Sequence, residues 1–197
     1  MSQRHKVFVS YHHANDQSYR NQFENLFANH HDILVSQSVQ IGDINEYLPA
    51  DRIRQIIRDQ YLRETTVTVV LIGAETWQRK HVDWEIGASI RNTHYNPRSG
   101  LIGILLPSYQ AASHGLLQPA TYKSAANDTY RKYNERTVPP RLVDNVNCGF
   151  AKIYDWSNDP TQVQRWIHEA FLMRNRVNPD NSFPNFVNNR HGSQWQR

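Results

Sequence analysis

The chain has 197 residues, of which 39% are hydrophobic, 11% aromatic and 20% charged, and this balance predicts one domain with a packed core and excludes wholesale disorder. Its 22 Lys and Arg are interleaved with 18 Asp and Glu, for a net charge of +4, so we expect no nucleic-acid partner. The longest apolar runs are too short for a membrane span, the first residues lack the apolar core of a signal peptide, and Cys148 has no cysteine partner. We therefore expect a cytoplasmic protein with no membrane partner.

The first half of the chain alternates strand-like and helix-like patterns. β-Branched and aromatic residues predict a strand over 6–11, and an amphipathic helix led by Asp16 follows it. Residues 33–35 predict a second short strand. Apolar residues at helical spacing over 53–62 predict a second helix. The continuous run over 67–72, ended by Gly73, is typical of a central parallel strand that is covered on both faces.

In the second half, we expect a third helix over 79–94 and a fourth strand over 101–106. Residues 107–148 are polar and too long for a loop of a compact domain, so we interpret them as an insertion with some helix in it. Residues 151–154 alternate like an edge strand, and Asp159-Pro160 opens a last helix. The domain is expected to cover 1–176, because the composition of 177–197 is typical of a flexible tail.

Five strands alternating with helices predict an α/β fold, an open parallel sheet with helices on both faces. The pattern alone does not give the strand order. If the order is the flavodoxin-like 2-1-3-4-5, ligands lie beyond the carboxyl ends of the first and third strands. This rule points to the loops after Ser10 and Gly73, and to the start of the third helix.

The common signatures of nucleotide-binding and hydrolytic folds are missing. The sequence has no Gly-rich dinucleotide fingerprint, P-loop, zincin motif or nucleophile elbow. His12-His13 and His30-His31-Asp32 offer metal-binding residue types, but adjacent residues at a strand end point in opposite directions. We therefore predict no metal site.

The segment 76–90 carries the most informative constellation. On a helical wheel Glu85 lies about 60° to one side of Val82, at the margin of the buried stripe and near the predicted ligand crevice. A solvated helix glutamate is the alternative that this pattern leaves open. Asp83 faces elsewhere, so the two carboxylates do not form a glycosidase-like pair.

These segments resemble a known family. Residues 7–11 followed by Asp16 resemble the first box of TIR domains, and 67–73 with Trp77 to Ile86 resembles their third strand and the helix that carries the catalytic glutamate. Over about residues 5–106 the chain is similar to the TIR-like proteins of the Thoeris antiphage system.

The resemblance implies a flavodoxin-like TIR fold and an enzyme that cleaves NAD at the nicotinamide riboside bond. It also implies an ADP-ribose-derived messenger that activates an effector protein, a phage-derived trigger and self-association. NAD would be the substrate, and no cofactor is expected. The sequence leaves open whether water attacks to give ADP-ribose or a group of the bound product attacks to give a cyclic nucleotide.

Cleavage of NAD develops positive charge on the ribose, so a fixed carboxylate stabilises the transition state, as in glycoside hydrolysis. We assign Glu85 this catalytic role. The substrate-binding candidates are Phe8, Ser10, Tyr11, Asp43, Trp77 and His81, and core packing is the alternative for Phe8, Tyr11 and Trp77. Aromatic rings would stack on the bases, hydroxyl and carboxylate groups would contact ribose or phosphate, and His81 occupies a position where TIR enzymes often have Trp.

Two other functional classes compete with the enzyme. A non-enzymatic TIR-like scaffold would act by self-association, whereas a receiver module would need paired acids after the first strand, which Ser10-Tyr11-His12 do not supply. Trp84 lies about 160° from the centre of the buried stripe, which predicts a solvent-facing indole and a candidate self-association contact. The alternative is that the insertion or the tail covers it.

Overall fold

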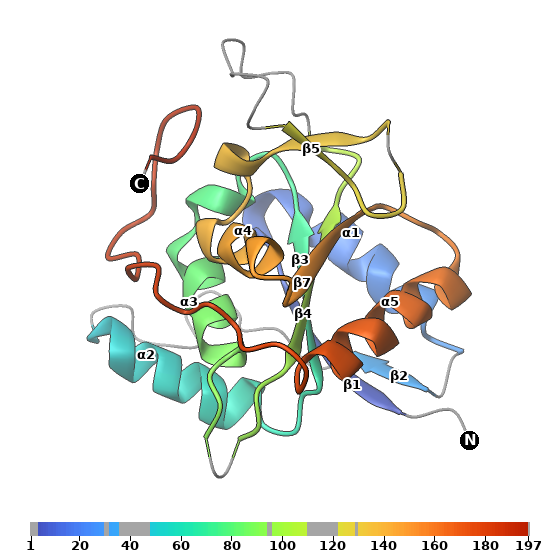
Figure 1. Ribbon diagram of the computed structural model, residues 1–197, viewed down its shortest axis with the longest axis horizontal. Coiled ribbons are helices and arrows are strands. Elements are labelled where there is room, and N and C mark those ends of the chain that lie inside the picture. The colour runs from blue at the N-terminus through green and yellow to red at the C-terminus, as the bar shows by residue number, and fades with distance from the viewer. Residues whose placement is uncertain are drawn as a thin grey trace.

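The computed structural model describes residues 4–29, 32–35, 48–93, 96–109, 122–128 and 130–196. Its centre is a five-stranded parallel sheet in the order β2-β1-β3-β4-β7 (Figure 1). The strands are β1 (His5–Ser10), β2 (Ile33–Val35), β3 (Val67–Ile72), β4 (Gly100–Leu105) and β7 (Ala151–Asp155). Val7 pairs with Val67, Val67 with Gly100, and Leu101 with Ala151. The predicted α/β fold is confirmed, the strand order is the flavodoxin-like one that the pattern alone did not give, and β7 is the expected edge strand.

Helices cover both faces of the sheet. They are α1 (His13–Leu26), α2 (Ala50–Ile56), α3 (Lys80–Ser89), α4 (Pro140–Asn147) and α5 (Pro160–Met173). Apolar residues of α1 and α5 pack on one face, and those of α3 and α4 pack on the other. Helix α2 and its π-helical continuation (Ile57–Tyr61) pack on Phe8 and on α3. The long apolar strands are buried throughout because both faces are covered.

The region 107–148 supplies the crossover between β4 and β7. Its described part contains a two-stranded antiparallel sheet of β5 (Tyr122–Ser124) and β6 (Lys132–Asn134), a 3₁₀ turn over Glu135–Thr137, and then α4. The helix in the expected insertion is therefore part of the core layer. Helix α3 also differs from its prediction, because it ends at Ser89 and not near residue 94.

The C-terminal segment packs against the domain, which differs from the flexible tail that the sequence predicted. Phe183, Phe186 and Trp195 are buried, and Trp195 Nε1 donates hydrogen bonds to the carbonyls of Glu135 and Val138. These few aromatic residues are enough to hold the segment against the domain, because the polar backbone between them also forms hydrogen bonds with the body of the protein. Within the described ranges, no helix is both long and apolar enough to cross a membrane.

Candidate active site

The carboxyl end of β1 brings Ser10 to Glu85. Side chains alternate along a strand, so Phe8 and Ser10 face the layer of α2 and α3, while Tyr11 packs with α1 and α5 on the other face. Ser10 Oγ donates a hydrogen bond to Glu85 Oε2 at 2.5 Å, and the exposed fractions of the two side chains are 0% and 1%. The structure thus joins a predicted binding residue and the predicted catalytic residue.

Glu85 is a buried carboxyl group without a cationic partner among the described residues. Burial raises its pKa to about 8 because the charged form loses hydration, and the hydrogen bond from Ser10 opposes this shift. In this conformation the group is mostly protonated at pH 7. A single carboxyl with a strongly raised pKa, at the predicted edge of a doubly wound sheet, is a typical mark of a functional site.

The connection from β3 to α3 is fixed by a polar cluster around Asp16. Thr76 Oγ1 accepts a hydrogen bond from the Gly73 amide at 2.9 Å and contacts the Asp16 carboxylate at 3.4 Å. A β-carbon at Gly73 would collide with that carboxylate, so this close approach requires glycine. Burial raises the pKa of Asp16, and hydrogen bonds from Ser108 and Thr76 oppose the shift. The cluster anchors the start of the segment that leads to Glu85.

His81 belongs to a group of imidazoles beside the start of α1. The His13 ring stacks on Tyr11 at 4.3 Å between centroids and meets His81 edge-on at 5.4 Å. Burial, followed by the charges of neighbouring groups, lowers the pKa values of His12 and His81 to about 4, so both are neutral at pH 7. Across the described residues, no group of three or more His, Cys, Asp or Glu is arranged to hold a metal ion, and His30 and His31 lie outside them.

The three aromatic candidates are all in the core. Phe8 packs with Ile53, Ile57 and Trp84, Trp77 packs in the cluster beneath α3 and α4, and the Tyr11 hydroxyl donates to Gln17 Oε1. Their burial agrees with core packing, the alternative that the sequence left open, and a role in substrate binding remains a prediction. Asp43 lies outside the described residues.

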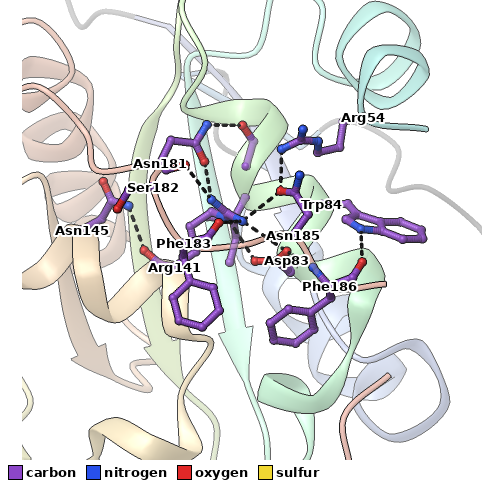
Figure 2. A network of polar contacts seen from close by, with 12 residues as sticks. Arg54, Asp83, Trp84, Arg141, Asn145, Asn181, Ser182, Phe183, Asn185 and Phe186 are labelled. Carbon is purple, nitrogen blue, oxygen red and sulfur yellow. Dashed lines mark hydrogen bonds and ion pairs between the residues drawn. The ribbon is translucent and has the colours of Figure 1, made fainter. Parts of the chain in front are cut away.

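The solvent-facing position predicted for Trp84 is wrong. Its exposed fraction is 4%, and its Nε1 donates a hydrogen bond to the Phe186 carbonyl at 2.8 Å (Figure 2). The wheel angle was sound, but a helix wheel does not show that the C-terminal segment covers the outer face of α3. Trp84 is therefore not an exposed self-association contact in this structure.

A buried ion pair on the same helix was not foreseen. Arg141 Nε donates to Asp83 Oδ1 at 3.0 Å, and both side chains are almost fully buried between α3, α4 and the C-terminal segment (Figure 2). Asp83 and Arg141 are 58 residues apart, and neither stands out from the charged residues around it. The only sequence signal is the Asn-rich aromatic segment itself, which can offer amides to a buried guanidinium.

The order of the parallel sheet is that of an open doubly wound α/β domain, and the buried glutamate on α3 against the end of β1 agrees with the TIR-like fold that the resemblance implies. Residues 8–111 match the family model described as Thoeris protein ThsB, TIR-like domain. The chain therefore belongs to that family. None of the curated proteins matches it.

A search of solved structures finds the TIR domains of the activated Roq1 resistosome that directly recognises the pathogen effector XopQ. That chain has 10% sequence identity and a TM-score of 0.34, and the alignment covers 87% of this chain and 84% of the other. This distant likeness carries no argument about function.

Proposed function

We propose that this protein is an NAD-cleaving enzyme of the Thoeris antiphage system, with Glu85 as its catalytic carboxylate. The observation that carries the proposal is the buried Glu85 carboxyl, hydrogen-bonded to Ser10 at the carboxyl end of β1. Ligands of open parallel sheets bind at this edge. Family membership supports the same assignment, because the matched residues 8–111 include both Ser10 and Glu85.

The proposed reaction breaks the bond between the nicotinamide nitrogen and the ribose C1′. The bonding electrons leave with nicotinamide, whose ring loses its positive charge, so no general acid is required. The positive charge that develops on the ribose is stabilised by ionised Glu85. Water then attacks C1′ and loses a proton to give ADP-ribose, or a nucleophilic group of the bound ADP-ribosyl moiety attacks and loses its proton to give a cyclic messenger for an effector protein.

The resting conformation is closed in this proposal. Glu85 is 1% exposed and mostly protonated at pH 7, so substrate must reach a carboxyl that has gained solvent or a cationic neighbour. The pyridinium charge of NAD is such a neighbour. A phage-derived trigger, acting through self-association, would open the site and favour the ionised form.

The direct test is incubation of the purified protein with NAD, followed by chromatography of released nicotinamide, with and without lysate from infected cells. We expect Glu85→Gln to abolish release while keeping the fold, because it preserves size and removes only the ionisable group. Glu64→Gln, at an exposed glutamate paired with Lys6, is the matched control and should keep full activity. Wild-type turnover by Glu85→Gln would refute the assignment.

A non-enzymatic scaffold is the second candidate, and the burial of Glu85 favours it. Mass spectrometry of nucleotides in infected cells that express the chain separates the two functions. An enzyme depletes NAD and produces nicotinamide with an ADP-ribose derivative. A scaffold leaves the levels of all three compounds unchanged, and its Glu85→Gln variant protects cells as well as the wild type does.

A further inference from the structure

The C-terminal strap, defined here as residues 178–192, follows α3 along its length in the opposite direction. Figure 1 shows this red segment beside the green helix. Asn181 Nδ2 donates to the Gly87 carbonyl at 3.1 Å near the end of α3. At the other end, the Arg190 amide donates to the Gln78 carbonyl at 2.7 Å, just before the helix begins. The strap therefore contacts both ends of the helix that carries Glu85.

The strap also caps the start of α3. The residue that precedes the helix, Arg79, makes no side-chain capping bond. Instead, Asn189 Oδ1 accepts a hydrogen bond from the Lys80 amide at 3.0 Å. A cap normally comes from the residue just before the helix, and Asn is among the preferred types. Here an asparagine 109 residues away in sequence takes that role.

At the middle of α3 the strap holds the two residues that precede Glu85. The Phe186 amide donates to Asp83 Oδ2 at 3.1 Å, and the Phe186 carbonyl accepts from Trp84 Nε1 at 2.8 Å (Figure 2). The backbone N–H and C=O of one strap residue are thus bonded to neighbouring side chains of the helix. Asp83 and Glu85 lie about 200° apart around the axis at 3.6 residues per turn, so the strap grips the side opposite Ser10.

Arg141 fastens the strap to the body of the domain. Its guanidinium donates to the Asp83 carboxylate, to the carbonyls of Asn181 and Phe183 and to the Asn185 side chain (Figure 2). A β-carbon at Gly87 would come within 3.3 Å of Arg141 Nε, so glycine here lets the guanidinium approach the helix closely. Helices α3 and α4 and the strap therefore share one buried polar centre.

We infer that the strap is a positioning element of the active site: it fixes the rotation and axial position of α3, and so holds the Glu85 carboxyl at Ser10. Asn181, Asn189 and Arg141 are positioning residues, because they reach Glu85 only through the helix. The inference rests on the proposed function for its catalytic consequence. Its geometric consequence, the fixed environment of Glu85, is independent of any activity.

The experiment compares the full-length wild type with Asn181→Ala/Asn189→Ala, which removes the side-chain bonds to the two ends of α3 but keeps the backbone bond from Arg190 to Gln78 and the buried aromatics. Asn188→Ala, at an exposed neighbouring strap residue, is the matched control. Asn189→Asp should rescue the cap, because a carboxylate accepts the same amide bond. The Glu85 side-chain carboxyl is titrated by carbon-13 NMR, with its signal assigned by its absence from Glu85→Gln.

In the double variant we expect the Glu85 titration midpoint to fall by about one pH unit or more, since a looser helix admits water to the carboxyl. Under conditions where the wild type cleaves NAD, and at a pH above 8 so that Glu85 is mostly ionised in both proteins, kcat should fall roughly ten- to a hundredfold with KM little changed. Asn188→Ala should match the wild type in both readouts.

A double variant that melts at lower temperature but keeps the wild-type titration midpoint and kcat would overturn the inference and leave the strap a purely stabilising segment. If the wild type cleaves no NAD under any condition, the proposed function fails. The titration of Glu85 then decides the inference alone, with the same two outcomes.

Discussion

Asp83 and Glu85 lie two residues apart on α3, face opposite sides of the helix, and meet opposite surroundings. Asp83 forms a buried ion pair with Arg141, whereas Glu85 accepts a hydrogen bond from the neutral Ser10 hydroxyl. Burial disfavours the charge of a carboxylate unless a cation or several donors compensate for it. The same helix therefore directs the ion-paired carboxylate of Asp83 toward Arg141 of α4, and the carboxyl of Glu85, with its strongly raised pKa, toward Ser10 of β1.

Protein stability should fall as the pH rises above 6.5, because of Glu85. Its folded-state pKa of about 8 exceeds the ordinary value of 4.5, so the folded state retains a proton that the unfolded chain has released. The stabilisation is complete below pH 4.5 and is lost as the pH rises toward and through 8, by up to about 1.4 kcal/mol per pH unit.

Thermal melting of the wild type and Glu85→Gln between pH 6.5 and 8 measures this effect. The lower limit avoids His5, His12 and His81, whose lowered pKa values stabilise the fold above pH 6.5 and cost stability as the pH falls toward 4. The difference in melting temperature should grow with pH in favour of the Gln variant. A constant difference would mean that Glu85 titrates near its ordinary value.

Ser10→Ala should lower the rate of NAD cleavage at pH 7 roughly tenfold or more and shift the pH–rate curve to higher pH. The Ser10 hydroxyl donates a hydrogen bond that favours the ionised form of Glu85. Removal of the hydroxyl therefore raises the pKa of the Glu85 carboxyl, by the free energy of a charge-assisted hydrogen bond. Activity should recover at higher pH. Ser99→Ala, at a buried serine before β4, serves as the control, and a pH–rate curve that Ser10→Ala leaves unmoved would contradict the role of Ser10.

Trp84→Ala should destabilise the fold by about 3–5 kcal/mol, as expected for removal of a buried tryptophan. The loss includes packing against Phe8 and α2, and it leaves the Phe186 carbonyl without its indole donor. Chemical denaturation measures the free energy of unfolding. A change below about 1 kcal/mol would show that the strap does not cover Trp84 in solution.

Arg141→Met should destabilise the fold by about 3–5 kcal/mol, because it leaves the Asp83 carboxylate buried without its cation. Asp83→Asn/Arg141→Met should cost less than the sum of the two single changes, since the neutral side chain needs no counter-charge. Lys152→Met breaks a solvent-exposed ion pair with Glu169 and should cost less than about 1 kcal/mol. Equal losses for Arg141→Met and Lys152→Met would contradict the buried position of the Asp83–Arg141 pair.

Local pattern determined much of this fold. The strands at 33–35 and 67–72 occur where β-branched runs predicted them, and the last helix begins at Pro160 with Asp159 accepting a hydrogen bond from the Thr161 amide. These features depend on neighbours within a few residues, so the sequence states them directly. The motif around Glu85 also placed it on the third helix, close to the end of the first strand.

Tertiary structure alone decided what surrounds that helix. Tyr11, Trp77 and Trp84 are buried by elements far away in sequence, and the Asn-rich segment after Val177 pairs its backbone and amides with α3 and Arg141. Propensity and helical periodicity describe one element at a time, and neither reports which distant segment supplies a hydrogen bond or excludes water. The pKa of Glu85 is set in the same way, because burial is a property of the assembled layers and not of residues 76–90.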